Sequence, residues 1–357
     1  MEIEPFALER WLARYEHGAD VVLAESGVRS LPASRFDTDP GDLGYVVPTN
    51  GDPGFRATLA ERYGRSADEV LFTCGTQEAN FLAFLSLVGP DDHAVVVTPT
   101  YGALSALPAA FGSATRVELE PPRWTLDVDA VADAMEPETR LVVLANPNNP
   151  TGRYHAEEVV EALYDLAADA DAYLLCDEVY RMLADRPHPP VASLGPHGLS
   201  TAGLSKAYGL AGLRFGWLVG DADVIERAWR WKDYTTISPS RFGQHVARQA
   251  LGRREGTILR ENRALARRNR DVVSAFLEER GVEWYEPVGV QGFPTVPAGF
   301  DGGDAFCRTV VEDEGVVLAP GEAFGHRDRF RIGFGVETAR LRRGLDRIGR
   351  VIDRSEG

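Results

Sequence analysis

The chain has 357 residues, 44% of them hydrophobic, with three cysteines and a formal net charge of −16. This length predicts about two domains, and the acidic balance argues against nucleic acid or anionic membranes as partners, because both bind basic surfaces. The start, MEIEPFALER, lacks a signal-peptide pattern, and no apolar stretch approaches the roughly 18 residues that cross a bilayer. We therefore expect a cytoplasmic protein without a disulfide framework.

The first predicted element is a short amphipathic helix over residues 5–17, PFALERWLARYEH, opened by a proline. We assign residues 1–39 to an N-terminal segment that packs with a small C-terminal domain.

Residues 40–245 alternate short apolar runs with helical patterns. The runs are EVLFT, AVVVT, RLVVLAN, AYLLCDEVY and RFGWLVG. Apolar runs of this length between helices predict an α/β domain, with a mostly parallel sheet covered by helices on both faces.

Residues 246–357 begin with a long polar helix pattern, TILRENRALARRNRDVVSAFLEERG. Short strand patterns, VVLAP and FRIGFG, then alternate with helices up to ETARLRRGLDRIGRVIDR. This arrangement predicts a smaller α+β domain, and the lack of a long linker predicts that the two domains pack closely.

Polar residues follow the predicted strands of residues 40–245, where ligands bind in open α/β sheets. Each motif taken alone has a plain structural explanation as a turn, a core aromatic or a loop. The motifs supply Gly75, Thr76 and Gln77 in CGTQEA, Tyr101 in TPTYG, Asn149 in NPNNPTG, Asp177 and Tyr180 in CDEVY, and Ser205 and Lys206 in GLSK, with Arg214 beyond.

Lys206 is one of only two lysines, the other being Lys232, in a chain that otherwise uses arginine. An amine can lose its proton and attack a carbonyl group, which a guanidinium cannot do, so Lys206 is a candidate nucleophile. The other motifs offer a helix start that can bind phosphate at residues 75–77, an aromatic ring that can stack at Tyr101, and a carboxylate at Asp177 that needs a cationic partner. Together these residues indicate a pyridoxal phosphate site with a Schiff-base lysine.

In CGTQEA, TPTYG, NPNNPTG, DEVY, GLSKAYGLAGLRFG and RIGF, taken in this order, the chain resembles the class I/II aminotransferases of fold type I. ERWLARYEHGADVVLAESGV, LSKAYGLAGLR and WKDYTTISPS carry a further likeness to the branch of capreomycidine synthase and short aspartate-aminotransferase-like homologues. The resemblance covers almost the whole chain. It implies a homodimeric enzyme that uses amino acid and 2-oxo acid substrates in a ping-pong cycle.

The resemblance also implies roles for the residues of the matching motifs. Lys206 bonds the cofactor covalently and moves a proton, Asp177 keeps the pyridine nitrogen protonated, and Asn149 and Tyr180 bind the phenolic oxygen. Tyr101 stacks on the ring, and Gly75, Thr76, Gln77, Ser205 and Arg214 hold the phosphate. Arg331 in FRIGF grips the substrate carboxylate, with Gly27 and Asn149 beside it.

Three positions depart from the family pattern or bear on the substrate. Gly203 stands where many relatives carry a hydroxyl group, and one extra residue separates Tyr45 from Gly51, which leaves the expected contact of Tyr45 to the partner subunit's phosphate open. Asp233 lies where aspartate-specific members bind the donor's side chain. It either disfavours dicarboxylic donors and welcomes a cationic one, or it is an exposed helix-end charge paired with Lys232.

The alternatives to transamination keep the cofactor and change the bond that breaks: a lyase, a decarboxylase or a cyclase resembling capreomycidine synthase. A non-catalytic pyridoxal phosphate sensor is a further alternative, although the chain leaves no room for a DNA-binding module. The seven histidines show no metal-ligand spacing, so we expect no metal. Abundant carboxylates with almost no lysine resemble proteins adapted to high salt.

Overall fold

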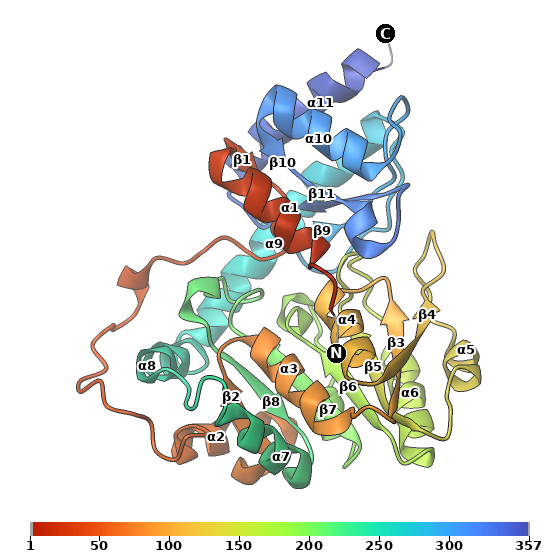
Figure 1. The fold of residues 1–357 in the computed structure, drawn as a ribbon. Coiled ribbons are helices and arrows are strands. Elements are labelled where there is room, and N and C mark those ends of the chain that lie inside the picture. The colour runs from red at the N-terminus through yellow and green to blue at the C-terminus, as the bar shows by residue number, and fades with distance from the viewer. Residues whose placement is uncertain (1–2, 356–357) are drawn as a thin grey trace.

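The computed structural model describes residues 3–355 and is built around a seven-stranded sheet. The strand order is β2-β8-β7-β6-β5-β3-β4, with β8 antiparallel to both neighbours and the other pairs parallel (Figure 1). The strands are β2 (Val70–Thr73), β3 (His93–Thr98), β4 (Ser113–Glu118), β5 (Thr139–Ala145), β6 (Tyr173–Asp177), β7 (Gly198–Gly203) and β8 (Gly216–Val219). The expected α/β fold with a mostly parallel sheet is confirmed.

Helices cover both faces of this sheet because its central strands are buried on both sides. The helices α3 (Thr76–Leu87), α4 (Gly102–Phe111) and α7 (Ala222–Lys232) share one apolar cluster with residues of the sheet. On the opposite face, α5 (Val128–Asp133) and α6 (Glu157–Asp169) contribute to the second and larger cluster. Near-continuous apolar runs such as LVVL in β5 are what a strand buried on both faces requires.

The smaller α+β part combines both ends of the described chain. The helix α1 (Ala7–Tyr15) and the strand β1 (Val21–Val22) lie against elements of the C-terminal third, and β1 pairs in parallel with β10 (Val316–Val317) (Figure 1). The indole of Trp11 donates a hydrogen bond of 2.7 Å to the Leu318 carbonyl oxygen. The other elements are β9 (Gln291–Gly292), α10 (Gly303–Glu314), β11 (Ala319–Pro320), β12 (Phe330–Gly333) and α11 (Thr338–Ser355), with α9 (Glu255–Glu279) running from the large part.

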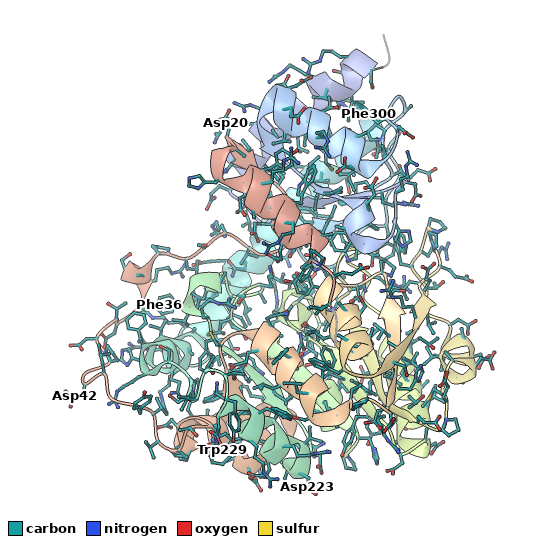
Figure 2. The ribbon with its side chains drawn as sticks, in the orientation of Figure 1. Asp20, Phe36, Asp42, Asp223, Trp229 and Phe300 are labelled. Carbon is teal, nitrogen blue, oxygen red and sulfur yellow. The ribbon has the colours of Figure 1, made fainter. Side chains whose placement is uncertain are left out.

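The segment between the N-terminal part and α2 (Pro53–Ala60) forms an outer arc past α8 (Arg241–Ala250) (Figure 2, Phe36 and Asp42). Backbone N–H groups at both ends of the arc bond to α8: Asp37 to the Gln249 side chain and Asp52 to Gln244. The arc therefore lies on the outside of the large part and is anchored at its two ends.

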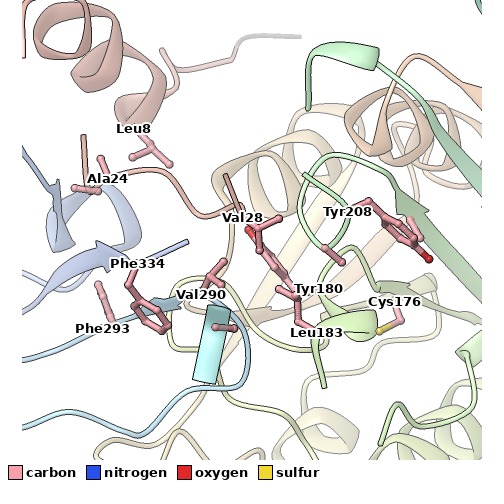
Figure 3. Packing of buried hydrophobic residues seen from close by; sticks show 14 of the residues in the cluster. Leu8, Ala24, Val28, Cys176, Tyr180, Leu183, Tyr208, Val290, Phe293 and Phe334 are labelled. Carbon is pink, nitrogen blue, oxygen red and sulfur yellow. The ribbon is translucent and has the colours of Figure 1, made fainter. Parts of the chain in front are cut away.

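The larger apolar cluster joins the two parts of the molecule. Leu8, Ala24 and Val28 of the N-terminal segment belong to it together with Tyr180 of the large part and Phe334 of the C-terminal third (Figure 3). This continuity agrees with the expectation that the parts pack closely. The predicted boundaries at residues 39 and 245 stay predictions, and positions 1–2 and 356–357 of the predicted ranges lie outside the described residues.

Within residues 3–355, no helix is both long enough and apolar enough to cross a membrane. Two strands that the sequence reading did not identify, β4 and β7, complete the sheet. The strand β7 is entirely buried although its residues, GLSTAG, are small and partly polar.

Candidate active site

A cavity of about 320 Å³ lies at the carboxyl ends of the parallel strands. Nine of the predicted site residues line it: Thr76, Gln77, Tyr101, Asn149, Asp177, Tyr180, Ser205, Lys206 and Arg214. The other three, Gly27, Gly75 and Arg331, do not line the cavity, but each lies against a residue that does. The motifs that follow five separate strands therefore meet in one place, as ligand sites of open α/β sheets do.

The turn between β2 and α3 has the geometry of an anion cradle. Gly75 has a φ of +79°, and a Cβ atom there would lie 2.7 Å from Nη2 of Arg214. Thr76 follows as the first residue of α3, and its buried hydroxyl oxygen has no hydrogen-bond partner in the described chain. A helix start, a guanidinium and an unpartnered hydroxyl group fit a phosphate group.

Gly203 leaves the space that this hydroxyl group occupies. A Cβ atom on Gly203 would lie 2.6 Å from Oγ1 of Thr76 and 2.9 Å from the carbonyl oxygen of Phe215. The departure noted in the sequence is therefore matched by Thr76, which brings a hydroxyl group to the same place from the neighbouring element.

Asp177 is 8% exposed, and its two oxygens accept hydrogen bonds from neutral donors. The Asn80 amide donates at 2.9 Å and the Val179 backbone N–H at 3.1 Å. Burial raises the pKa of Asp177, although these hydrogen bonds and the charge of Lys206 oppose the rise. Because no ion pair among residues 3–355 includes Asp177, its site can accept a cationic ring nitrogen.

Lys206 and Tyr180 share one hydrogen-bond acceptor. Nζ of Lys206 donates to the Ser26 hydroxyl at 3.2 Å, and the Tyr180 hydroxyl donates to the same oxygen at 2.8 Å. Oε2 of Glu25 lies 3.9 Å from the same ammonium nitrogen. A Cβ atom on Gly27 would lie 3.4 Å from Cδ of Lys206, so this segment packs closely against the lysine side chain.

Arg331 stands behind Asn149 and is almost fully buried. Its Nη1 donates to Oδ1 of Asn149 at 2.9 Å, its Nη2 donates to the Ala24 carbonyl oxygen at 2.6 Å, and its Nε has no hydrogen-bond partner among the described residues. Burial lowers the pKa of Arg331, and the nearby Tyr180, Glu25 and Tyr101 oppose the shift. The guanidinium is therefore held next to the cavity by two fixed acceptors.

Four further polar residues line the cavity and were not predicted from the sequence: Glu9, Glu25, Ser26 and Asn80. Asn80 stands four residues after Thr76 on α3, so helical spacing could have placed it on the same face. The other three belong to the N-terminal segment, where no strand-end motif marks them.

The structure bears on one of the two alternatives for Asp233, the pair with Lys232. Lys232 does not pair with it: the lysine side chain is fully buried and forms an ion pair of 3.1 Å with Glu78. Asp233 itself is exposed at the end of α7 and does not line the cavity of its own chain. In that alternative, the exposed helix-end position of Asp233 holds but its pairing with Lys232 does not, because Lys232 points into the protein; the preference for a donor stays a prediction.

Comparison with known proteins agrees with this geometry. The family model described as aminotransferase class I and II matches residues 28–348. Capreomycidine synthase from Streptomyces vinaceus is 35% identical, over 96% of this chain and 92% of the relative. An aspartate/prephenate aminotransferase from Thermus thermophilus is 30% identical, over 90% of this chain and 87% of the relative.

A solved structure shows the same fold over the full length of both chains. The crystal structure of a PLP-dependent aminotransferase from Streptococcus suis covers 100% of each chain, with a TM-score of 0.94 and 28% identity. The resemblance seen in the sequence motifs is thus confirmed. The chain belongs to the class I and II aminotransferase family, and it is a transaminase with pyridoxal phosphate as its cofactor.

Proposed function

We propose that the cavity takes an L-amino acid and a 2-oxo acid in turn and moves an amino group between them. The observation that supports this proposal is that Lys206, Asp177 and Asn149 line one cavity of about 320 Å³. Thr76 and Arg214 line the same cavity. Pyridoxal phosphate, when bound, supplies an electron sink for the negative charge that develops at the substrate Cα. Lys206 removes and returns the proton at that carbon through its Nζ.

The other predicted residues bind and orient in this proposal. Gly75, Thr76, Gln77, Ser205 and Arg214 hold the phosphate, and Tyr101 covers one face of the ring. Asp177 binds the pyridine nitrogen, and Asn149 and Tyr180 bind the phenolic oxygen. Arg331, with Gly27 and Asn149 beside it, binds the substrate carboxylate, for which a rigid guanidinium offers two parallel donors.

The test is a half-reaction with amino donors and no acceptor. Transamination converts the bound cofactor to its amine form and releases one 2-oxo acid, while Lys206→Ala abolishes the conversion but leaves the fold intact by circular dichroism. Release of ammonia or CO₂ without the amine form would instead support the second candidate, a lyase, decarboxylase or cyclase. The 35% identity to capreomycidine synthase is the observation that favours this second candidate.

We further propose a donor with a cationic side chain. Glu9 and Glu25 both line the cavity, and Glu9 is fixed by a hydrogen bond of 3.1 Å from the Tyr101 hydroxyl. Burial, followed by the charge of Glu9, raises the pKa of Tyr101, so the phenol stays protonated and donates. Burial, followed by the charges of Glu25 and Glu9, also raises the pKa of Glu16 on the same segment, which supports a negative potential beside the cavity.

A donor screen with arginine, lysine and aspartate tests this preference. We expect the two cationic donors to have the higher kcat/KM, and Glu9→Gln and Glu25→Gln to lower it for them by roughly 5- to 30-fold, the loss of about 1–2 kcal/mol from one charged hydrogen bond. Asp20→Asn is the matched control, because Asp20 lies on the same N-terminal segment but is exposed outside the cavity. Equal preference for aspartate in the unmodified enzyme contradicts the proposal.

We propose a homodimer formed through the outer arc. Leu43, Tyr45 and Val47 of the arc are at least 75% exposed, and Tyr234, in the turn after α7, is 87% exposed. The Trp229 indole on α7 donates to the Thr49 hydroxyl at 2.7 Å, so the arc lies along this helix. Exposed apolar side chains of this kind favour contact with a second copy, and Tyr45 would then approach the partner's cofactor site.

Sedimentation measurements test the dimer. The unmodified chain should sediment as a dimer, Leu43→Asp should shift it toward monomer, and Tyr45→Ala should weaken cofactor binding more than it weakens association. A monomeric unmodified chain at micromolar concentration would rule out the arc as an interface.

We also propose a cytoplasmic location and a stabilising effect of salt. Three free thiols support a reducing compartment, and exposed carboxylates such as Asp20, Asp42 and Asp223 lie at the periphery (Figure 2). Because salt screens repulsion between carboxylates, the melting temperature should rise from low salt to molar KCl. An unchanged melting temperature counts against the salt proposal.

A further inference from the structure

The second lysine of the chain is enclosed beneath the predicted phosphate turn. Lys232 is the last residue of α7, and its side chain has no exposed surface. Its Nζ donates to Oε2 of Glu78 at 3.1 Å and also to the hydroxyl group of Thr236. A fully buried ammonium group with a carboxylate partner is costly to desolvate, so the pair needs a reason beyond surface charge.

Glu78 links two segments that are far apart in the sequence. It is the third residue of α3, and its Oε2 also accepts the Cys74 backbone N–H at 2.5 Å. Its other oxygen, Oε1, accepts the hydroxyl groups of Thr236 at 2.6 Å and Thr235 at 3.1 Å. One carboxylate therefore bonds both to the residue that precedes Gly75 and to the turn that follows α7.

Lys232 and Glu78 each oppose the effect of burial on the other's pKa, so each favours the charged form of the other. Burial alone would raise the pKa of Glu78, but Lys232, the Cys74 N–H and the Thr236 hydroxyl more than offset it, so the pKa lies below its ordinary value. Burial lowers the pKa of Lys232, and Glu78 opposes that shift. Neither group reaches the cavity, whose lining includes Thr76 and Gln77, the two residues before Glu78.

We infer that Lys232 and Glu78 are positioning residues that hold the phosphate turn of residues 74–77 in its binding conformation. The inference rests on the proposed role of that turn in holding the cofactor phosphate. Glu78 fixes the Cys74 backbone, and Lys232 keeps the buried carboxylate ionised and oriented. A compact ammonium group suits this enclosed site better than the planar guanidinium that the chain uses elsewhere.

The experiment measures the dissociation constant of pyridoxal phosphate from the apoprotein for the unmodified chain, Lys232→Met and Glu78→Gln. Each single variant should bind at least about tenfold more weakly, and the double variant should lose less than the product of the two single losses, because it leaves no unpaired buried charge. At saturating cofactor, kcat should return to within about threefold, since neither residue touches the reacting atoms. Arg230→Met is the control, because Arg230 forms an exposed pair with Glu226 on the same helix.

Hydrogen exchange of the apoproteins gives a second readout. Peptides covering residues 74–78 and 233–237 should exchange faster together in Lys232→Met and stay unchanged in Arg230→Met. A folded Lys232→Met variant that binds pyridoxal phosphate with the same dissociation constant as the unmodified chain overturns the inference. If Lys232→Met does not fold, the same comparison with Glu78→Gln decides. If the unmodified chain itself does not bind pyridoxal phosphate, the proposed role of the turn fails instead.

Discussion

Nζ of Lys206 donates a hydrogen bond of 3.2 Å to the Ser26 hydroxyl group across 180 positions of the chain. This contact joins the predicted nucleophile on the large part to the N-terminal segment, whose strand β1 pairs with β10. Ser26 also accepts the Tyr180 hydroxyl at 2.8 Å. The position of the N-terminal segment therefore orients two groups of the cavity at once.

Ser26→Ala should reduce kcat by roughly 5- to 150-fold, because it removes the acceptor of the buried Tyr180 hydroxyl and the partly exposed Lys206 amine at a cost of about 1–3 kcal/mol. Steady-state kinetics at saturating cofactor measures the loss. Ser30→Ala, an exposed serine on the same segment, should retain full activity. An active Ser26→Ala enzyme would mean that Lys206 and Tyr180 are oriented without this hydroxyl group.

Thr76 and Gly203 should behave as a coupled pair. Gly203→Ser places a Cβ atom about 2.6 Å from Oγ1 of Thr76, so this substitution should weaken cofactor binding. Thr76→Ala should weaken it by removing a phosphate donor. Combining Thr76→Ala with Gly203→Ser removes the clash with Oγ1 and returns a hydroxyl group, so the double variant should bind better than Gly203→Ser alone. The closeness of the Phe215 carbonyl oxygen, 2.9 Å from the same Cβ position, should keep the affinity of the double variant below that of the unmodified chain. Cofactor titration of all three variants checks this order, and strict additivity would contradict the coupling.

Asp177→Asn should stabilise the apoprotein while it abolishes efficient turnover. Burial raises the pKa of Asp177, so the folded apoprotein disfavours the ionised form, and its stability falls as pH rises through that titration. Asparagine removes this cost, which should raise the free energy of unfolding at neutral pH by about 0.5–2 kcal/mol. The Asn80 amide, which now donates to Asp177, has to flip to accept from the new residue.

With pyridoxal phosphate bound, the unmodified protein should be more stable than Asp177→Asn, the reverse of the order expected for the apoproteins. The unmodified protein gains a charge pairing with the ring nitrogen that Asp177→Asn lacks, so its melting temperature should rise more. Thermal unfolding with and without cofactor measures both effects. An apoprotein that Asp177→Asn destabilises would show that the hydrogen bonds of the carboxylate outweigh its burial.

His155 should make the protein sensitive to acid. Its ring is 1% exposed, and burial, followed by the charge of Arg153, lowers its pKa from 6.5 to about 3. The folded pKa lies below the unfolded one, so the stabilisation is complete above pH 6.5 and is lost as pH falls toward 3, by about 1.4 kcal/mol per pH unit. Denaturant unfolding of His155→Asn at several pH values should give a shallower slope, whereas His17→Asn, at an exposed position, should keep the original slope.

The sequence by itself determined the fold class and nine residues of the cavity. Apolar runs such as AVVVT, with helices between them, predict buried parallel strands. Each site residue that the sequence identified follows a predicted strand or belongs to a motif with its own chemistry. Asp177, for example, is the second residue of CDEVY, where the apolar run AYLL ends. Local pattern and local chemistry coincide at such positions, so both can be read without the structure.

The strand β7 shows where local pattern fails. Its residues, GLSTAG, have only one bulky apolar side chain, Leu199, and yet all six are buried inside the sheet, between β8 and β6. A Cβ atom on Gly198 would lie 2.2 Å from the Val191 carbonyl oxygen, and Gly203 leaves room for Thr76. Small residues are required there because neighbouring elements approach closely, and that approach is a property of the packed molecule.

Tertiary structure alone placed Glu9, Glu25 and Ser26 at the cavity, because pairing between β1 and β10, about 295 positions apart by their register, brings the N-terminal segment over the sheet. It also decided the role of Lys232, which in sequence stands beside Asp233 but in the fold bonds to Glu78. Both outcomes depend on contacts between residues distant in the chain. Periodicity and composition report only which face of an element is apolar, whereas a buried charge takes its partner from whatever element the fold packs against it.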